Sequence, residues 1–105
     1  MSKTKEFMLG AVKWTILMDN NEMADVNALG MTYPNEAVVR LADFHKGKSI
    51  PKDLVEQTLY HEVVHAILGT MGYNELFEDE EFVQGFSLLL HQFETTKINQ
   101  NKEDE

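Results

Sequence analysis

Two histidines and a glutamate lie inside an otherwise apolar segment, residues 58–68, which read TLYHEVVHAIL. Around them, apolar residues recur at the spacing of an α-helix. These apolar positions are Leu54, Val55, Leu59, Val63, Ala66 and Ile67. Polar groups on a buried helix cost free energy unless something pairs with them. The sequence therefore predicts a buried helix over about 52–68 whose polar side chains share a bound partner.

The spacing of His61 and His65 is typical of a metal site. Four residues apart on a helix, the two rings project from one face at about 6 Å from each other, which suits the binding of one zinc ion. Glu62 is rotated by about 100° from His61, so it can take a proton from a metal-bound water without binding the metal. This predicts His61 and His65 as zinc ligands and Glu62 as the general base. The alternative is two core histidines with neutral hydrogen-bond partners.

The third ligand of a catalytic zinc is expected in the next helical segment, residues 79–95, which opens with three acidic residues. Around a helix, Glu80 points in the same direction as a polar face of small residues, whereas Glu81 points toward a more exposed face. We therefore predict Glu80 as the third ligand, with Glu81 and then Asp79 as alternatives. Acidic residues at a helix start also compensate the helix dipole, and some of them are expected to do only this.

The segments before these helices are rich in strand-forming residues. One strand is expected over 12–18, with Trp14 in the core, and two more on either side of the turn at 34–35. Strands followed by helices indicate an α+β fold, here a small antiparallel sheet of two to three strands and two main helices packed on one face. A stripe of large apolar residues on the second helix is expected to face the core. It consists of Phe82, Phe86, Leu89 and Phe93.

The length of 105 residues suits one domain spanning 1–105, with loose residues 1–6 and a disordered polar tail at about 97–105. A net charge of −9 argues against a nucleic-acid partner, and no apolar run is long enough to cross a membrane. There is no cysteine, so a metal has to be bound by His, Asp or Glu. Together these features favour a cytoplasmic protein and leave its oligomeric state open.

The motif at 61–65, His-Glu-Val-Val-His, and the helix start at 80–86, Glu-Glu-Phe-Val-Gln-Gly-Phe, together resemble the gluzincin zinc metallopeptidases. The resemblance is closest to their smallest members, the minigluzincins and related phage or prophage metallopeptidase-like proteins. In that family the second helix carries a glutamate, a small apolar residue three positions on and an aromatic residue six positions on, here Glu80, Val83 and Phe86. The resemblance thus implies a Zn²⁺ cofactor, Glu80 as its third ligand and a minimal zincin-like fold.

The resemblance also implies a substrate and a location. Gluzincins cleave a peptide or protein that lies extended along the last strand of the sheet, and residues 29–43 resemble the strand pair that precedes their motif helix. A phage-encoded member acts in the host cytoplasm. Members usually carry a Tyr or His that stabilises the oxyanion, for which Tyr60 and Tyr73 are the candidates.

The predicted function is therefore that of a zinc-dependent metallopeptidase, which hydrolyses peptide bonds through a metal-activated water. Two alternatives belong to other classes. One is a catalytically silent, zinc-stabilised module that binds a protein. The other is a helical-core protein without a metal. Another histidine, His91, lies eleven residues beyond Glu80, about 16 Å along the helix. It is therefore expected to pack rather than to share the metal.

Overall fold

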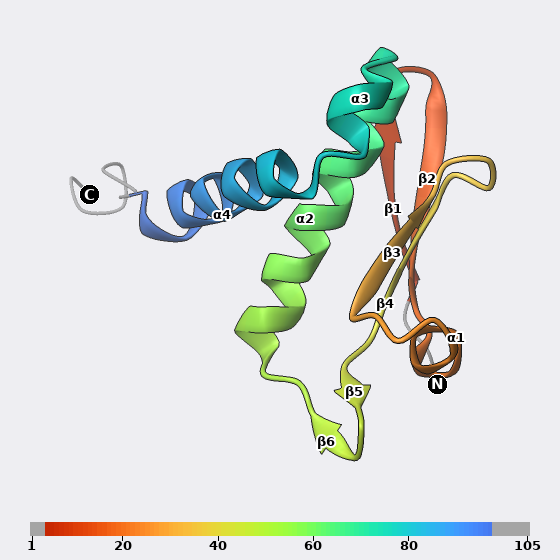
Figure 1. Cartoon of the computed structure of the whole chain (residues 1–105), viewed down its shortest axis with the longest axis vertical. Coiled ribbons are helices and arrows are strands. Elements are labelled where there is room, and N and C mark those ends of the chain that lie inside the picture. Colours follow the sequence, from red (N-terminus) through yellow and green to blue (C-terminus); the bar gives the residue numbers. More distant parts are fainter. Residues whose placement is uncertain (1–3, 98–105) are drawn as a thin grey trace, which may run out of the picture.

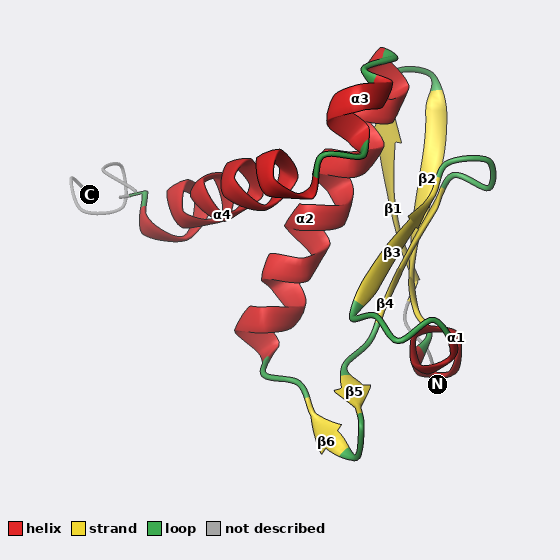
Figure 2. Ribbon diagram, in the orientation of Figure 1, coloured by secondary structure: helices red, strands yellow, loops and turns green. Residues whose placement is uncertain are grey.

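The computed structural model describes residues 4–97, in which six strands and four helices follow one another along the chain (Figure 1, Figure 2). The strands are β1 (Thr4–Leu9), β2 (Val12–Met18), β3 (Gly30–Tyr33), β4 (Val38–Leu41), β5 (Phe44–His45) and β6 (Lys48–Ser49). The helices are α1 (Asn20–Asp25), α2 (Lys52–Met71), α3 (Asn74–Phe77) and α4 (Glu80–Thr96). The predicted α+β class is confirmed. The parts of the predicted loose start and disordered tail that fall on 1–3 and 98–105 lie outside the described residues.

Strands β1 to β4 form one mixed sheet in the order β1-β2-β4-β3, and β5 and β6 form a separate pair. β1 is antiparallel to β2 and β3 is antiparallel to β4, but β2 and β4 are parallel. The predicted antiparallel sheet of two to three strands is therefore wrong in strand number and in strand direction. The chain leaves β2 through α1 and returns as the edge strand β3, so β4 enters between β2 and β3. Residues 4–6, predicted to be loose, begin β1 because they pair with β2.

Helix α2 lies along one face of the sheet, whereas α4 packs chiefly on α2 and α3 and extends away from the sheet (Figure 1). The buried cluster between the sheet and α2 consists of Trp14, Val39, Leu41 and Ala66. The buried cluster between α2 and α4 consists of Val64, Leu68 and Val83. The core position predicted for Trp14 is thus confirmed. The expectation that both main helices cover the sheet holds for α2 alone.

The large apolar residues of α4 do not face the core, so the predicted core stripe is wrong. The stripe residues are 39 to 68 % exposed, and they are Phe82, Phe86, Leu89 and Phe93. The residues that face α2 are instead Val83, Ser87 and His91, which are all buried. The small side chains of Val83 and Ser87 let the two helices approach closely. The bulky stripe lies about 130° around the helix from this face.

Helix α2 continues three residues beyond its predicted end, because Gly69 does not stop it. The helix ends at Gly72, which adopts a left-handed conformation with φ of 83°. A Cβ atom at Gly69 would lie 3.2 Å from the Phe77 ring. Gly69 therefore lets α3 fold back closely against α2, and this brings the backbone of Phe77 to the motif residue His65.

Candidate metal centre

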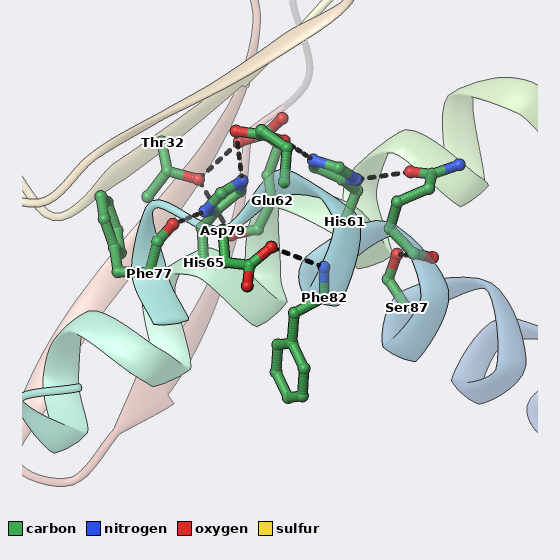
Figure 3. Close-up of polar contacts among 10 residues, drawn as sticks. Thr32, His61, Glu62, His65, Phe77, Asp79, Phe82 and Ser87 are labelled. Atoms are coloured by element: carbon green, nitrogen blue, oxygen red, sulfur yellow. Dashed lines mark hydrogen bonds and ion pairs between the residues drawn. The ribbon is translucent and has the colours of Figure 1, made fainter. Parts of the chain in front are cut away.

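Helix α2 presents His61 and His65 on one face, one turn apart, as their spacing predicted (Figure 3). The centroids of the two rings are 5.0 Å apart. His65 is buried and His61 is largely covered. Both rings direct their Nε2 atoms toward the start of α4, where the third predicted ligand lies.

Glu80, the first residue of α4, lies against both histidine rings. Its Oε1 atom is 2.9 Å from His61 Nε2, and its Oε2 atom is 3.2 Å from His65 Nε2. One ligand atom from each of the three residues lies within 4.8 Å of the other two, so a single metal ion could contact all three. Among residues 4–97 these three form the one group with this property.

The two alternatives to Glu80 have other positions. Asp79 is the N-cap of α4, and its side chain accepts a hydrogen bond from the Phe82 amide at 3.0 Å (Figure 3). It thereby satisfies a free amide at the helix start and compensates the helix dipole. Glu81 is exposed and does not belong to the cluster. The fold therefore brings Glu80 to the histidines, and neither of the other two acids.

Each histidine is held through its Nδ1 atom. His61 Nδ1 is 2.7 Å from Oε1 of Gln84, and His65 Nδ1 is 2.6 Å from the carbonyl oxygen of Phe77. A carbonyl oxygen only accepts hydrogen bonds, so Nδ1 carries a proton, and a neutral ring in this position has its lone pair on Nε2. Neither Gln84 nor Phe77 was predicted as a site residue. Gln84 could have been found, because on α4 it lies one turn after Glu80.

Three groups with lone pairs therefore meet at one point. The two Nε2 atoms face the oxygens of Glu80 at 2.9 and 3.2 Å. Lone pairs at such distances repel one another unless a proton or a metal cation lies between them. Protonated rings would each donate to one oxygen of Glu80, whereas a single divalent cation would be bound by all three groups at once. The two imidazoles and one carboxylate could thus hold one divalent cation.

Glu62 lies beside this group and is 7 % exposed. The hydroxyl of Thr32 on β3 donates to Glu62 Oε1 at 2.7 Å and lies 2.9 Å from the Glu62 carbonyl oxygen (Figure 3). Burial raises the pKa of the Glu62 carboxyl, whereas the Thr32 hydrogen bond and the two histidines lower it. The carboxylate is fixed in direction and is more basic than usual, as a general base requires. Sequence reasoning missed Thr32, because nothing local shows which strand residue faces α2.

A cavity of about 570 Å³ opens at this cluster. Its walls come from β3 with the loop before it, from α2, from the end of α3 with the segment after it, and from the first half of α4. Among the described residues, neither Tyr60 nor Tyr73, the candidates for oxyanion stabilisation, lines the cavity. Tyr60 packs edge-on against His91 with ring centroids 5.1 Å apart, and Tyr73 is exposed. His91 in turn lies 3.0 Å from Glu56, away from the metal cluster, in agreement with its predicted packing role.

No helix in the part of the chain from 4 to 97 combines the length and the apolar character that crossing a bilayer demands. In comparisons with known proteins, no protein-family model, no curated protein and no solved structure matched the chain. The likeness to gluzincins therefore rests on the motif residues alone.

Proposed function

We propose that this protein is a zinc-dependent metallopeptidase. In this proposal His61, His65 and Glu80 bind the zinc, and Glu62 is the general base. The observation that supports it most is the meeting of two imidazole nitrogens and one carboxylate at the wall of a cavity, next to a buried carboxylate that is held by Thr32.

The donor set suits zinc. Two neutral imidazoles and one carboxylate are the ligands of catalytic zinc sites that leave a fourth position for water or substrate. The oxygen acceptors behind His61 and His65 select the tautomer and the ring orientation that binding requires. Zinc in this position would lower the pKa of a bound water to about 7 and polarise the substrate carbonyl.

Glu62 supplies the proton transfers. Its carboxylate accepts a proton from the attacking water and then donates this proton to the nitrogen of the leaving amine. The hydrogen bond from Thr32 holds Oε1 in place while the other oxygen stays available for the proton. One water and one peptide bond are consumed, and Glu62 ends in its starting state.

An extended peptide is the substrate class that the cavity fits. Among the described strands β3 is an edge strand, since it pairs only with β4, and Gly30, Met31 and Thr32 line the cavity. The unpaired backbone groups of an edge strand can bind an extended segment as an added strand. A peptide bound in this way would pass close to Glu62. The sequence without cysteine supports a cytoplasmic site of action.

Metal binding is tested first, on protein purified without added metal and then titrated with zinc. We expect one zinc per chain, and zinc at a hundredfold its Kd should add about 2.7 kcal/mol to the free energy of unfolding. A chelator should abolish this gain. His65→Ala should lose zinc binding, whereas Glu81→Gln, which removes an exposed carboxylate from the same turn of α4, is the matched control and should keep it. A chain that binds no zinc and melts at the same temperature with chelator refutes the proposal.

Cleavage is tested on the zinc-loaded protein with a library of unstructured peptides, followed by mass spectrometry. Glu62→Gln should keep the zinc and lose at least about 100-fold in cleavage rate, because general acid–base catalysis contributes this much or more. If the zinc-loaded wild type cleaves nothing in the library, the metal site stands and the peptidase proposal fails.

A second candidate function is a zinc-stabilised module that binds a protein segment without cleaving it. It is favoured by the free edge of β3 together with Met31, which is 40 % exposed beside the cavity. These features supply backbone and side-chain contacts that need no chemistry. Partner binding that survives Glu62→Gln, in a chain that cleaves no peptide, would support this function over the first.

A further inference from the structure

The apolar stripe of α4 is an exposed feature that the proposed function leaves unused. It consists of Phe82, Phe86, Leu89 and Phe93, which are 39 to 68 % exposed. These residues follow one another at steps of four, three and four, which is the spacing of the seam in a two-helix coiled coil. Because α4 extends away from the sheet, this side of the helix is accessible to another molecule (Figure 1).

The size of the stripe suits a reversible interface. An aromatic side chain has a surface on the order of 200 Å², so three phenylalanines and one leucine, each about half exposed, present on the order of 400 Å² of apolar surface. An exposed patch this large on a single chain often marks an interaction site. A stable interface takes about 800 Å² from each partner, so the stripe and its flanks fit an association in the micromolar range rather than a permanent one.

We propose that the stripe is covered by the same stripe of a second copy of this chain, with the two α4 helices antiparallel about a two-fold axis. The stripe is symmetric about the middle of the segment 82–93, because Phe82 and Phe93 are equally far from this point, as are Phe86 and Leu89. Antiparallel pairing on this axis sets Phe82 against Phe93 of the second copy and Phe86 against Leu89. Every layer of the seam is then apolar on both sides, as a self-complementary interface requires.

Charge selects the antiparallel direction over the parallel one. The acidic run at 78–81 lies at the start of α4, and Lys97 caps its end. In a parallel pair the two acidic runs would lie side by side and repel. In the antiparallel pair they are about 25 Å apart, more than two Debye lengths at 0.1 M salt, and each lies near the Glu94–Lys97 ion pair of the second copy, which has no net charge. The pairing uses neither the metal cluster nor the cavity, so it holds or fails independently of the proposed function.

Sedimentation velocity of the full chain across the micromolar range tests the pairing. We expect a monomer–dimer equilibrium that Leu89→Glu weakens at least about tenfold. Thr95→Glu, which adds the same charge on the opposite side of α4, is the matched control and should leave the dimer intact. Circular dichroism establishes that both variants are folded. A chain that stays monomeric, or a dimer that both variants weaken equally, overturns the proposal. So does a monomer whose stripe binds lipid vesicles or a helix of another protein instead.

The direction of pairing is tested by disulfide cross-linking, which the cysteine-free chain makes unambiguous. Phe82→Cys and Phe93→Cys are made as separate proteins and oxidised alone and mixed. Antiparallel pairing predicts that the mixed disulfide forms in preference to either homodimer, because identical positions are about 16 Å apart along the helices. Homodimeric disulfides of each variant in preference to the mixed one would overturn the antiparallel arrangement.

Discussion

Gly30→Ala is expected to destabilise the protein, although alanine normally stabilises a strand relative to glycine. Gly30 begins β3 where this strand passes α2. A Cβ atom at Gly30 would lie 2.6 Å from Cγ2 of Thr58, 3.1 Å from Cγ of Glu62 and 3.2 Å from Cδ2 of Leu41. Carbon atoms that are not bonded prefer separations of about 3.5–4.0 Å. The contact with Thr58 therefore requires the strand or the helix to move.

The methyl group of Thr58 cannot turn aside easily. Its hydroxyl donates to the Leu54 carbonyl oxygen at 2.8 Å, and a β-branched side chain in a helix has few rotamers. One extra methyl group in a packed site costs about 1–3 kcal/mol. The loss of unfolded-state entropy on replacing glycine offsets up to about 1 kcal/mol of this. We expect a net loss of about 1–2 kcal/mol in the free energy of unfolding, which lowers Tm by roughly 4–16 °C.

The assay is a double-mutant cycle of Gly30→Ala and Thr58→Ser, followed by urea and thermal unfolding with chelator present. Thr58→Ser removes the methyl group and keeps the hydroxyl. The double variant should therefore be about 1 kcal/mol more stable than the sum of the two single effects predicts. A Gly30→Ala protein as stable as the wild type, or two effects that simply add, would refute the close approach of β3 to α2.

Three further predictions concern single side chains. Thr32→Val should lower the free energy of unfolding by about 1–3 kcal/mol in urea titrations, because the buried Glu62 carboxylate loses its hydrogen bond, and Thr32→Ser should not. Burial raises the pKa of Glu62, so the folded chain holds this proton more tightly than the unfolded chain and gains stability as pH falls through that pKa. Metal-free Glu62→Gln should therefore melt above the wild type at neutral pH, and melting curves at lower pH should show the difference shrinking. Val83→Ala should cost about 2 kcal/mol because Val83 is fully buried, whereas Leu89→Ala, at 68 % exposure, should cost less than about 1 kcal/mol in dilute solution where the chain is monomeric.

The predictions that held concern residues whose relation is local. His61 and His65 share a face in any α-helix, and helical direction separates Glu80 from Glu81 within one turn. The structure places the side chains of His61, His65 and Glu80 together, and the binding of zinc by these residues stays a prediction. The α+β class also followed from the order of strand-like and helix-like segments.

The predictions that failed concern contacts between segments. The antiparallel sheet was wrong because the insertion of β4 between β2 and β3 depends on pairing across α1, which no local pattern records. The outward stripe of α4 was wrong for a related reason. Periodicity shows that a helix has an apolar side. Which side packs on α2 depends on how closely the two helices fit, and here the smaller residues Val83 and Ser87 are buried against α2.

By itself, the amino-acid sequence determined a helix that carries His61, Glu62 and His65 within about one turn, and a second helix that starts with acidic residues. It could do so because backbone hydrogen bonds and side-chain direction in a helix depend on near neighbours alone. Only the tertiary structure decided that Thr32 faces Glu62, that Phe77 and Gln84 hold the histidine rings, and that four large apolar residues point outward. These contacts join residues that are far apart in the chain. Which residues meet depends on how the surfaces of whole helices and strands pack without leaving voids.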